Sequence, residues 1–404
     1  MTKPSVEKQL EIIERGAVEI IPREELIEKL NHSHKSGQPL RIKLGCDPTR
    51  PDLHLGHSVI LRKMRQFQDL GHHTILIIGD FTAMIGDPSG ANKTRPALTR
   101  EEVVENGRSY FEQASKILDP DKTEIVFNSN WLSPMTFEDV IRLASHYTVA
   151  RMIERDDFTK RYQNNDSISL HEFLYPLAQG QDSVHLMSDL ELGGIDQKFN
   201  LLVGRHLQRE FGQSPQICLM MPLLVGTDGT HKMSKSYDNY IGIEEKPEDM
   251  YGKVLSIPDS LIYPYFELAT DVPHDELPSL KEKADMEPRN TKHELAWTIT
   301  RMYHGHDKAE QARFHFERTV IKKDVPDDIP EYTFSPGTNH RILDIIKSTG
   351  FASSNSEARR LLGQGGVTID GEKITDPNLE IHLSDDDEKV LKVGKRKFGL
   401  IKGS

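Results

Sequence analysis

The chain has 404 residues, which exceeds an ordinary single domain, so two or three domains are expected. Hydrophobic residues make up 36% and charged residues 28% of the sequence, which is typical of a globular enzyme and excludes disordered and fibrous chains. The net charge of −12 excludes a protein that is basic throughout, although a local group of lysines and arginines would still bind phosphates.

No apolar stretch approaches the roughly 18 to 20 residues that a membrane-spanning helix needs. The N-terminal segment MTKPSVEKQLEIIERGAVEI is charged and lacks the apolar part of a secretory signal. The two cysteines, Cys46 and Cys218, are too few for a disulfide framework and lack zinc-type spacing. These features predict a cytoplasmic protein that does not enter a membrane.

The first third of the chain predicts a doubly wound α/β fold. Residues up to about Asn31 are expected to be helical, because their apolar side chains recur at helical spacing. A strand is expected at 41–45 (RIKLG), a helix at 55–70 and a buried parallel strand at 73–81 (HTILIIGDF). Strand, helix and strand form the crossover unit of a Rossmann-like parallel sheet. Ligands of such sheets bind at the carboxyl ends of the strands, where CDPTRPD and IGDPSG fall.

The remaining chain predicts further parts. Residues 101–185 are mostly helical in pattern and are expected to be an insertion between the halves of the sheet, and 216–226 (QICLMMPLLVG) reads as a late buried strand. A segment rich in proline and aspartate, 324–340, is typical of a linker. The predicted domains are a catalytic nucleotide-binding domain at 1–240, a helical domain at 241–325, a linker at 326–338 and a small α+β RNA-binding domain at 339–404.

The first chemical motif is HLGH, which places His54 and His57 three residues apart at the start of a helix. The free N–H groups and the dipole of a helix N-terminus favour phosphate, and Gly56 lets a nucleotide approach the backbone. The motif therefore predicts a triphosphate site. The alternative is a pair of histidines that only pack or face solvent.

The second motif is KMSKS, residues 232–236, in a glycine-bearing loop (TDGTHKMSKS) after a buried strand. Lys232 and Lys235 suit a loop that closes over phosphates, because nucleotidyl transfer depends on stabilising charge on phosphate oxygens. The alternative is a solvated surface loop.

The two motifs, in this order and about 175 residues apart, resemble the paired motifs of class I aminoacyl-tRNA synthetases, with leucine replacing the usual isoleucine of the first. Further segments resemble the bacterial tyrosyl-tRNA synthetases, and the likeness extends over essentially the whole chain. These segments are DPTRPDLHLGH (47–57), IGDPSG (85–90), LYPLAQGQDS (174–183) and GGIDQ (193–197).

The resemblance implies a role for each matching residue. Asp182 matches the carboxylate that accepts a hydrogen bond from the tyrosine hydroxyl, and phenylalanine would leave this acceptor unpaired. The α-ammonium of tyrosine is assigned to Asp87, Tyr175 and Gln179, and the region of the substrate carboxylate and α-phosphate to Gln197. The residues implied on the ATP side are Asp47, Thr49, His54, Gly56, His57, Asp196 (at the ribose), Lys232 and Lys235.

Several of these residues also have a plain structural interpretation. Asp87 before Pro88 is typical of a turn. Tyr175, Gln179 and Asp182 stand at spacings of four and three, which a surface helix also shows.

Three positions depart from the pattern of the family. Lys43 stands where better-known members have a tyrosine that also touches the substrate hydroxyl, so this second contact is in doubt. Ala91 replaces a basic residue that serves the pyrophosphate in many relatives, which leaves Arg95, with Lys93 as a second candidate, for that role. Gln181 replaces a common aromatic residue beside Asp182.

The C-terminal segment RILDIIKSTGFASSNSEARRLLGQGGVTIDGEKITD resembles the small RNA-binding domain first known from ribosomal protein S-four. NSEARRLL predicts a helix that presents Arg359 and Arg360, and GGVTIDGEKI predicts a hairpin with an Asp-Gly turn. Lys395 and Arg396 add positive charge. Adjacent arginines also suit a solvated helix face, but behind a synthetase body they predict contacts with tRNA phosphates.

The resemblance implies that ATP activates L-tyrosine as an adenylate and that the tyrosyl group then passes to the 3′ end of tRNA(Tyr). ATP is expected as its magnesium complex, with no protein metal site and no tightly bound cofactor. Relatives of this kind are homodimers, so a homodimer is expected. The alternatives are a tryptophanyl-tRNA synthetase, a small-molecule nucleotidyltransferase and a non-catalytic RNA-binding or splicing factor built on a synthetase body.

Overall fold

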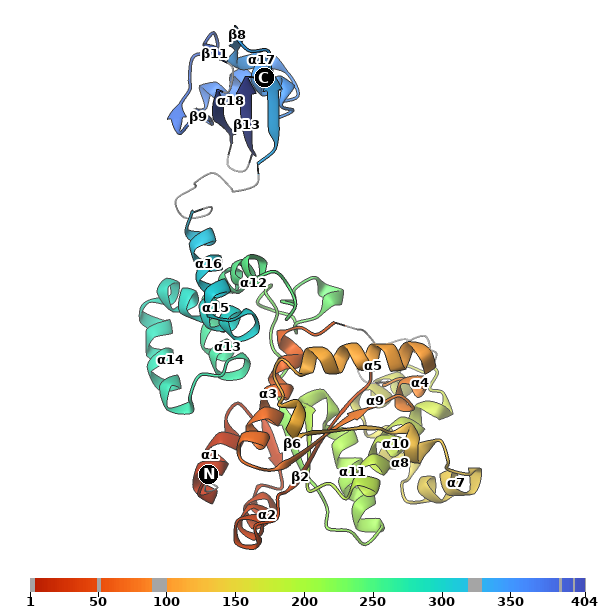
Figure 1. Cartoon of the computed structure of the whole chain (residues 1–404). Helices are drawn as coiled ribbons and strands as arrows, with labels where there is room; N and C mark the ends of the chain where they lie inside the picture. The colour runs from red at the N-terminus through yellow and green to blue at the C-terminus, as the bar shows by residue number, and fades with distance from the viewer. Residues whose placement is uncertain are drawn as a thin grey trace. The chain divides into compact units, whose positions relative to one another are not determined.

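The computed structural model describes residues 4–48, 52–88, 100–318, 329–384, 387–394 and 397–403, except for the side chains of residues 100, 101 and 103–105 (Figure 1). The chain divides into two compact units, Met1–Gln311 and Ala312–Ser404, and each is described by itself. Across the described ranges, no helix has both the length and the apolar content that crossing a bilayer requires.

A six-stranded sheet forms the centre of the first unit. Its strands are β1 (Glu19–Ile21), β2 (Arg41–Cys46), β3 (His73–Ile78), β4 (Thr123–Phe127), β5 (Leu190–Gly194) and β6 (Ile217–Met221). They lie in the order β1-β6-β5-β2-β3-β4, with β1 antiparallel to β6 and the other pairs parallel. The chain first moves outward from β2 and then returns to β5, so the topological switch point lies between these two strands. The predicted doubly wound fold is confirmed.

Helices surround this sheet and extend beyond it (Figure 1). In the first unit they are α1 (Val6–Glu14), α2 (Arg23–Ser36), α3 (Leu55–Asp69), α4 (Thr82–Ile85), α5 (Arg100–Ala114), α6 (Ser129–Leu132), α7 (Phe137–Ser145), α8 (Val149–Ile153), α9 (Asp156–Gln163), α10 (Leu170–Leu186), α11 (Lys198–Glu210), α12 (Pro247–Ser256), α13 (Ile262–Ala269), α14 (Leu277–Met286) and α15 (Pro288–His304). A further helix, α16 (His306–Phe316), spans the boundary between the units. Helices α12 to α15 pack on one another, and α13 packs against α3.

Helix α10, which carries three of the predicted site residues, is held tightly against α11. A Cβ on Gly180 would come within 2.6 Å of Leu207, and one on Gly204 would come within 2.6 Å of the Ser183 hydroxyl. Real Cβ atoms do not approach so closely, so the two glycines are needed for this helix contact. The contact fixes where α10 places its side chains.

Two sequence predictions need correction in this unit. The single helix expected up to about Asn31 is wrong, because α1 ends at Glu14 and β1 precedes α2. This three-residue strand is held by pairing with the distant β6, which local periodicity does not reveal. The segment 101–185 is also not wholly an insertion, because it contains β4, the edge strand that pairs in parallel with β3.

The second unit is a small α+β structure. Its elements are β7 (Glu331–Phe334), β8 (Thr338–Arg341), α17 (Ile342–Ser348), α18 (Asn355–Gly363), β9 (Val367–Ile369), β10 (Glu372–Lys373), β11 (Glu380–Leu383), β12 (Glu388–Val393) and β13 (Lys397–Gly403). One sheet has the order β10-β9-β12-β13-β7, and β11 pairs with β8. Side chains of α17, α18 and the strands form a common apolar core.

The predicted linker, 326–338, is only partly correct. Its residues 331–334 form β7, which pairs in parallel with β13 at the far end of the chain. The proline-rich and aspartate-rich composition obscured this four-residue strand, because each of its residues pairs with one 69 positions later in the sequence. The expected hairpin is confirmed: β9 and β10 flank Asp370 and Gly371, which both have positive φ angles.

Candidate active site

A cavity of about 270 Å³ lies at the carboxyl ends of β2, β3 and β5, at the switch point of the sheet. Helix α10 and the segments that follow these strands supply its walls. Seven of the predicted site residues line it: Asp47, His57, Asp87, Tyr175, Gln179, Asp182 and Gln197. Residues from four separate sequence segments therefore meet in one cavity.

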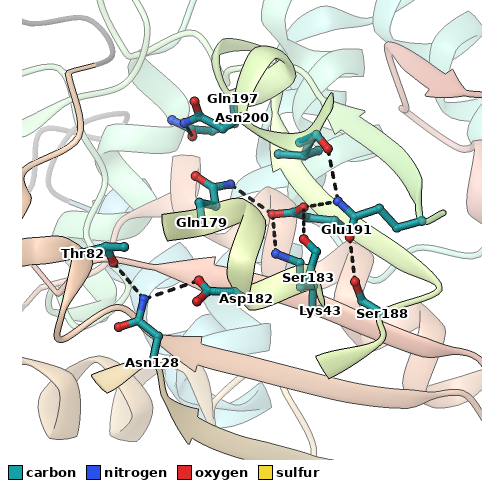
Figure 2. Close-up of polar contacts among 12 residues, drawn as sticks. Lys43, Thr82, Asn128, Gln179, Asp182, Ser183, Ser188, Glu191, Gln197 and Asn200 are labelled. Atoms are coloured by element: carbon teal, nitrogen blue, oxygen red, sulfur yellow. Dashed lines mark hydrogen bonds and ion pairs between the residues drawn. The ribbon is translucent and has the colours of Figure 1, made fainter. Parts of the chain in front are cut away.

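Asp182 is a buried carboxyl group on the wall of this cavity, with only 3% of its surface exposed. The indole Nε1 of Trp131 donates a 2.9 Å hydrogen bond to its Oδ1. The amide of Asn128 donates to its Oδ2 at 3.4 Å and also to Thr82 (Figure 2). Burial raises the pKa of Asp182 to about 7, against the opposing effects of Lys43 and these two donors. Both carboxylate oxygens are thus oriented by donors from outside α10.

Asp87 is held by a second set of polar side chains. A terminal nitrogen of the Arg155 guanidinium contacts Oδ1 of Asp87 at 3.2 Å, and Nε2 of Gln197 donates to Oδ2 at 2.9 Å. Asn200 in turn donates to Oε1 of Gln197 at 2.8 Å. Arg155 is 5% exposed and also pairs with Asp157 at 2.8 Å, so one buried guanidinium contacts two carboxylates. Asp87 and Gln197, assigned to different groups of the substrate, are in direct contact.

Tyr175 and Asp47 are also in direct contact. The Tyr175 hydroxyl donates to Oδ2 of Asp47 at 2.8 Å, and Thr82 Oγ1 donates to Oδ1 at 2.7 Å. A Cβ on Gly79 would come 2.0 Å from the Asp47 Oδ1, so only glycine fits there. Burial raises the pKa of Tyr175 well above its usual value, so the hydroxyl keeps its proton and remains a donor.

The two histidines of HLGH cap helix α3. The backbone N–H of Gly56 donates to Nδ1 of His54 at 3.1 Å, and the N–H of His54 donates to Nδ1 of His57 at 3.2 Å. Because each Nδ1 accepts a hydrogen bond, a neutral ring must carry its proton on Nε2. Burial, with the nearby positive charge of Lys235, lowers the pKa of His54 to about 3 and that of His57 to about 4. Both rings are therefore neutral near pH 7 and each has one N–H donor at Nε2.

The structure gives a second reason for glycine at position 56, besides the close approach of a nucleotide. A Cβ there would come 2.9 Å from the ring of His54 and 3.5 Å from Met233. The absence of a side chain thus makes room for the histidine cap, as well as leaving the backbone open.

The lysine-bearing loop is organised by one buried side chain, Asn239, which is 2% exposed. Its Oδ1 accepts from the N–H of Ser234 at 2.8 Å, and its Nδ2 donates to the carbonyl of Lys232 at 3.1 Å. The residues that follow pair with the start of α3: the N–H of Leu55 donates to the carbonyl of Ile241 at 2.9 Å. The two motifs, far apart in sequence, are therefore joined by backbone hydrogen bonds.

The two loop lysines differ in environment. Lys235, on a short 3₁₀ turn (Lys235–Tyr237), forms an ion pair with Asp52 and lies 5.7 Å from the centre of the Tyr240 ring. Lys232 is exposed, as is Asp196, and neither of them lines the cavity.

Lys43 does not line the cavity either. It is completely buried, and its Nζ forms a 2.8 Å ion pair with Glu191 (Figure 2). Its contact is thus with a carboxylate of the neighbouring strand β5.

Some predicted site residues lie outside the described residues. These are Thr49, Ala91, Lys93, Arg95, Lys395 and Arg396. In the second unit, Arg359 and Arg360 lie exposed on α18, as expected, and Arg360 contacts Gln364 at 3.2 Å.

The sequence does not predict five residues that hold the site residues in place through hydrogen bonds or ion pairs: Asn128, Trp131, Arg155, Glu191 and Asn239. None of them belongs to a recognisable motif, and each contacts its partner across the fold. A polar residue inside an apolar strand was the one available signal, and Glu191 in LELGG shows it.

Comparison with protein families identifies two regions of the chain. A model described as tRNA synthetases class I (W and Y) matches residues 35–320, and an S4 domain model matches residues 341–387. The tyrosine–tRNA ligase of Salinibacter ruber is 56% identical over 404 residues, covering 100% of this chain and 98% of the relative. That of Chlorobaculum tepidum is 58% identical over 401 residues, covering 98% of each.

Solved structures share the fold. A C-terminally truncated mitochondrial tyrosyl-tRNA synthetase of Aspergillus nidulans matches with a TM-score of 0.64 at 22% identity, covering 78% of this chain and 94% of that one. The tyrosyl-tRNA synthetase of Archaeoglobus fulgidus, complexed with L-tyrosine, matches with a TM-score of 0.62 at 24% identity, covering 76% of this chain and 100% of that one.

The doubly wound sheet, the joined histidine and lysine motifs and the matching family model define a class I aminoacyl-tRNA synthetase. Within that class the chain belongs to the bacterial tyrosyl-tRNA synthetases, because identities above 50% extend over nearly its whole length. The tryptophanyl and non-catalytic alternatives are not favoured by these relatives.

Proposed function

We propose that the cavity at the switch point is where this enzyme carries out the tyrosine–tRNA ligase reaction. The carboxylate of tyrosine attacks the α-phosphorus of ATP, which gives tyrosyl-adenylate and pyrophosphate. The terminal ribose hydroxyl of tRNA then attacks the activated carbonyl and releases AMP. The attacking carboxylate is already ionised, so the first step needs alignment and charge stabilisation rather than a general base.

The arrangement of carboxylates supports the assignment of tyrosine to this cavity. Asp182 accepts the hydrogen bond of the phenol, while Asp87, Tyr175 and Gln179 hold the ammonium group. Gln197, which contacts Asp87, is proposed to act where the substrate carboxylate meets the α-phosphate. The single observation that carries this proposal is that Asp182 and Asp87, each with its own fixed donors, line the same cavity.

The joined motifs support the assignment of ATP. The Nε2–H groups of His54 and His57 donate to phosphate oxygens, and Lys235 supplies positive charge to the transition state. Lys232 and Asp196, both exposed, are expected to reach ATP when it is bound, with Asp196 at the ribose. Asp47, Thr49 and Arg95 complete the proposed ATP side. Magnesium enters with ATP as part of the substrate complex and neutralises phosphate charge.

We also propose that the enzyme is a homodimer that pairs through helices α7 to α10. Large apolar side chains are exposed along these four helices: Phe137 (81%), Ile141 (55%), Val149 (63%), Tyr162 (63%) and Leu170 (81%). Phe137 and Ile141 are four residues apart and share one face of α7. Sedimentation of a Phe137→Glu/Ile141→Glu variant should yield monomers, whereas Met286→Glu, at an equally exposed position on α14, should not.

The second unit is proposed to bind tRNA(Tyr) phosphates through Arg359 and Arg360, together with Lys395 and Arg396. A cytoplasmic location stays a prediction from the sequence.

Calorimetric titration with tyrosine tests the site assignment. Asp87→Asn should weaken tyrosine binding at least about tenfold, because a hydrogen bond between two charged groups is lost. Asp189→Asn is the matched control, since Asp189 is ion-paired to Lys29 away from the cavity, and it should bind normally. Equal affinities for the two variants would remove Asp87 from the site.

A further inference from the structure

The ion pair of Lys43 and Glu191 lies between two central strands, beneath the cavity. The two residues face each other in the register of β2 and β5, and their side chains are 0% and 1% exposed. Removing two charges from water costs several kcal/mol per ion, so an apolar pair of the same volume would stabilise the sheet as well or better. Stability alone therefore does not explain why a charged pair occupies this place.

Glu191 is the centre of a group of donors. The amide of Gln179 donates to its Oε1 at 3.0 Å, and the Ser183 hydroxyl donates to its Oε2 at 3.3 Å. The amide of Gln216 donates to the same Oε2. Gln179 is the member of this group that also lines the cavity, so it connects the buried pair to the substrate site.

The carboxylate decides which end of the Gln179 amide faces the cavity. An ionised carboxylate has only acceptors, so it binds the NH₂ group of the amide and turns the carbonyl oxygen the other way. Figure 2 shows the oxygen of Gln179 on the side away from Glu191. A substrate ammonium has only donors, so it needs that oxygen. The opposite amide orientation would present NH₂ groups to NH₃⁺.

We propose that Lys43 and Glu191 are positioning residues for tyrosine: Glu191 fixes the amide orientation of Gln179, and Lys43 keeps Glu191 in place beneath it. This inference rests on the proposed role of Gln179 toward the ammonium group. It also gives Lys43 a role, at a position where the family pattern leads one to expect a tyrosine. At the other end of the site, Lys43 lowers the pKa of Asp182 and Glu191 raises it, so removing both charges together makes these two effects offset each other.

Two analogues of tyrosine separate positioning from general damage. Tyramine has the phenol and the ammonium group, while 3-(4-hydroxyphenyl)propionate has the phenol but no ammonium group. Both are measured as competitive inhibitors of tyrosine-dependent ATP–pyrophosphate exchange by the full-length enzyme. The test variant is Lys43→Met/Glu191→Met, which removes both charges together and keeps side chains of similar size.

The proposal predicts that this variant binds tyramine at least about tenfold more weakly and leaves inhibition by 3-(4-hydroxyphenyl)propionate within about twofold. Equal weakening of both inhibitors, or of neither, would overturn it. Glu191→Asp is a second test variant that keeps both charges but shortens the carboxylate side chain, and it should show the same selectivity. Ser183→Ala is the matched control, since it removes a different donor to Glu191 and should leave both inhibitors unchanged.

Gln179→Met distinguishes failure of this inference from failure of the proposed site. If it weakens tyramine selectively while the Lys43 and Glu191 variants do not, Gln179 binds the ammonium group without help from the pair. If Gln179→Met itself changes neither inhibition constant, the proposed role of Gln179 is wrong. With the positioning role correct, adding the paired methionine substitutions to Gln179→Met causes no further loss of tyramine binding.

Discussion

The ammonium group of Lys235 forms an ion pair with the carboxylate of Asp52, two residues before His54. This contact, together with the backbone pairing of Leu55 and Ile241, joins the lysine loop to the start of α3. His54, His57 and Lys235, which are proposed to contact the phosphates of ATP, are therefore assembled around one helix end, where backbone N–H groups also favour anions.

Lys235→Ala should slow adenylate formation by about 10²-fold or more, because a preorganised positive charge at the developing phosphate charge is lost. Tyrosine affinity should change less than about twofold, since Lys235 does not line the cavity. Single-turnover kinetics and tyrosine titration measure the two quantities. Lys253→Ala is the control, because Lys253 lies over the same Tyr240 ring but outside the loop. Equal losses in rate and tyrosine affinity would exclude the role proposed for Lys235.

Asp182 predicts a pH dependence of tyrosine binding. Its pKa is raised to about 7 by burial, so below that pH one of its oxygens takes up a proton and the group becomes a weaker acceptor for the phenol. The phenol and ammonium groups of tyrosine, with ordinary pKa values of about 10 and about 8, both stay protonated as the pH falls below 7. The KM for tyrosine should therefore rise as pH falls through about 7, while the KM for ATP stays flat. A KM for tyrosine that is constant across this range would contradict the assignment.

The same group predicts the direction of a stability change. The folded-state pKa of Asp182 lies above the ordinary aspartate value of 3.8, so the folded enzyme binds a proton that the unfolded chain releases. Its contribution to the free energy of unfolding is thus greatest at low pH and declines as pH rises from about 4 to about 7. Asp182→Asn should flatten this part of the profile, which denaturant titrations at several pH values will show. An unchanged slope would mean that Asp182 does not titrate there.

Gly56→Ala should disturb the histidine cap, because the new Cβ would lie 2.9 Å from the ring of His54. Loss of a helix cap lowers the free energy of unfolding by about 1 kcal/mol. The rate of ATP–pyrophosphate exchange should fall as well, because His54 is no longer held in position. Gly252→Ala is a matched control in α12, where a Cβ meets open space, and it should stabilise the enzyme by about 0.5–1 kcal/mol. Thermal unfolding and exchange assays compare the two variants. A Gly56→Ala enzyme as active as the wild type would show that the cap does not position His54.

Arg359→Ala/Arg360→Ala should reduce tRNA charging and weaken its dependence on salt, since two phosphate contacts are removed. ATP–pyrophosphate exchange needs no tRNA in the proposed first step and should be unchanged. Arg341→Ala serves as the control, because Arg341 lies in the same unit but is ion-paired with Asp344. Normal charging by the double variant would exclude α18 from the tRNA surface.

The sequence predicts the parts of the fold that depend on neighbouring residues. β2, α3, β3 and β6 follow from apolar periodicity, and the Asp370–Gly371 turn follows from its residue types. β1, β4 and β7 were missed or misplaced because they are short and depend on partners far away in sequence. Periodicity within a window does not contain that information.

The site residues likewise fall into those that the sequence predicts and those that only the structure shows. Residues that belong to family motifs, such as His57 and Asp182, were found, and the fold brings them together. Trp131 and Arg155 were not found, because each supports a carboxylate across the fold and has no motif of its own. For Lys43 the sequence showed a departure from the family, and only the register of β2 and β5 shows its partner, Glu191.

The most direct test of the whole account is ATP–pyrophosphate exchange by the purified enzyme with tyrosine or phenylalanine as the amino acid. The account predicts robust exchange with tyrosine and at least about a hundredfold lower kcat/KM with phenylalanine, since the Asp182 carboxyl group would be left buried without its partner. Exchange that is absent with tyrosine, or equal with the two amino acids, would contradict it.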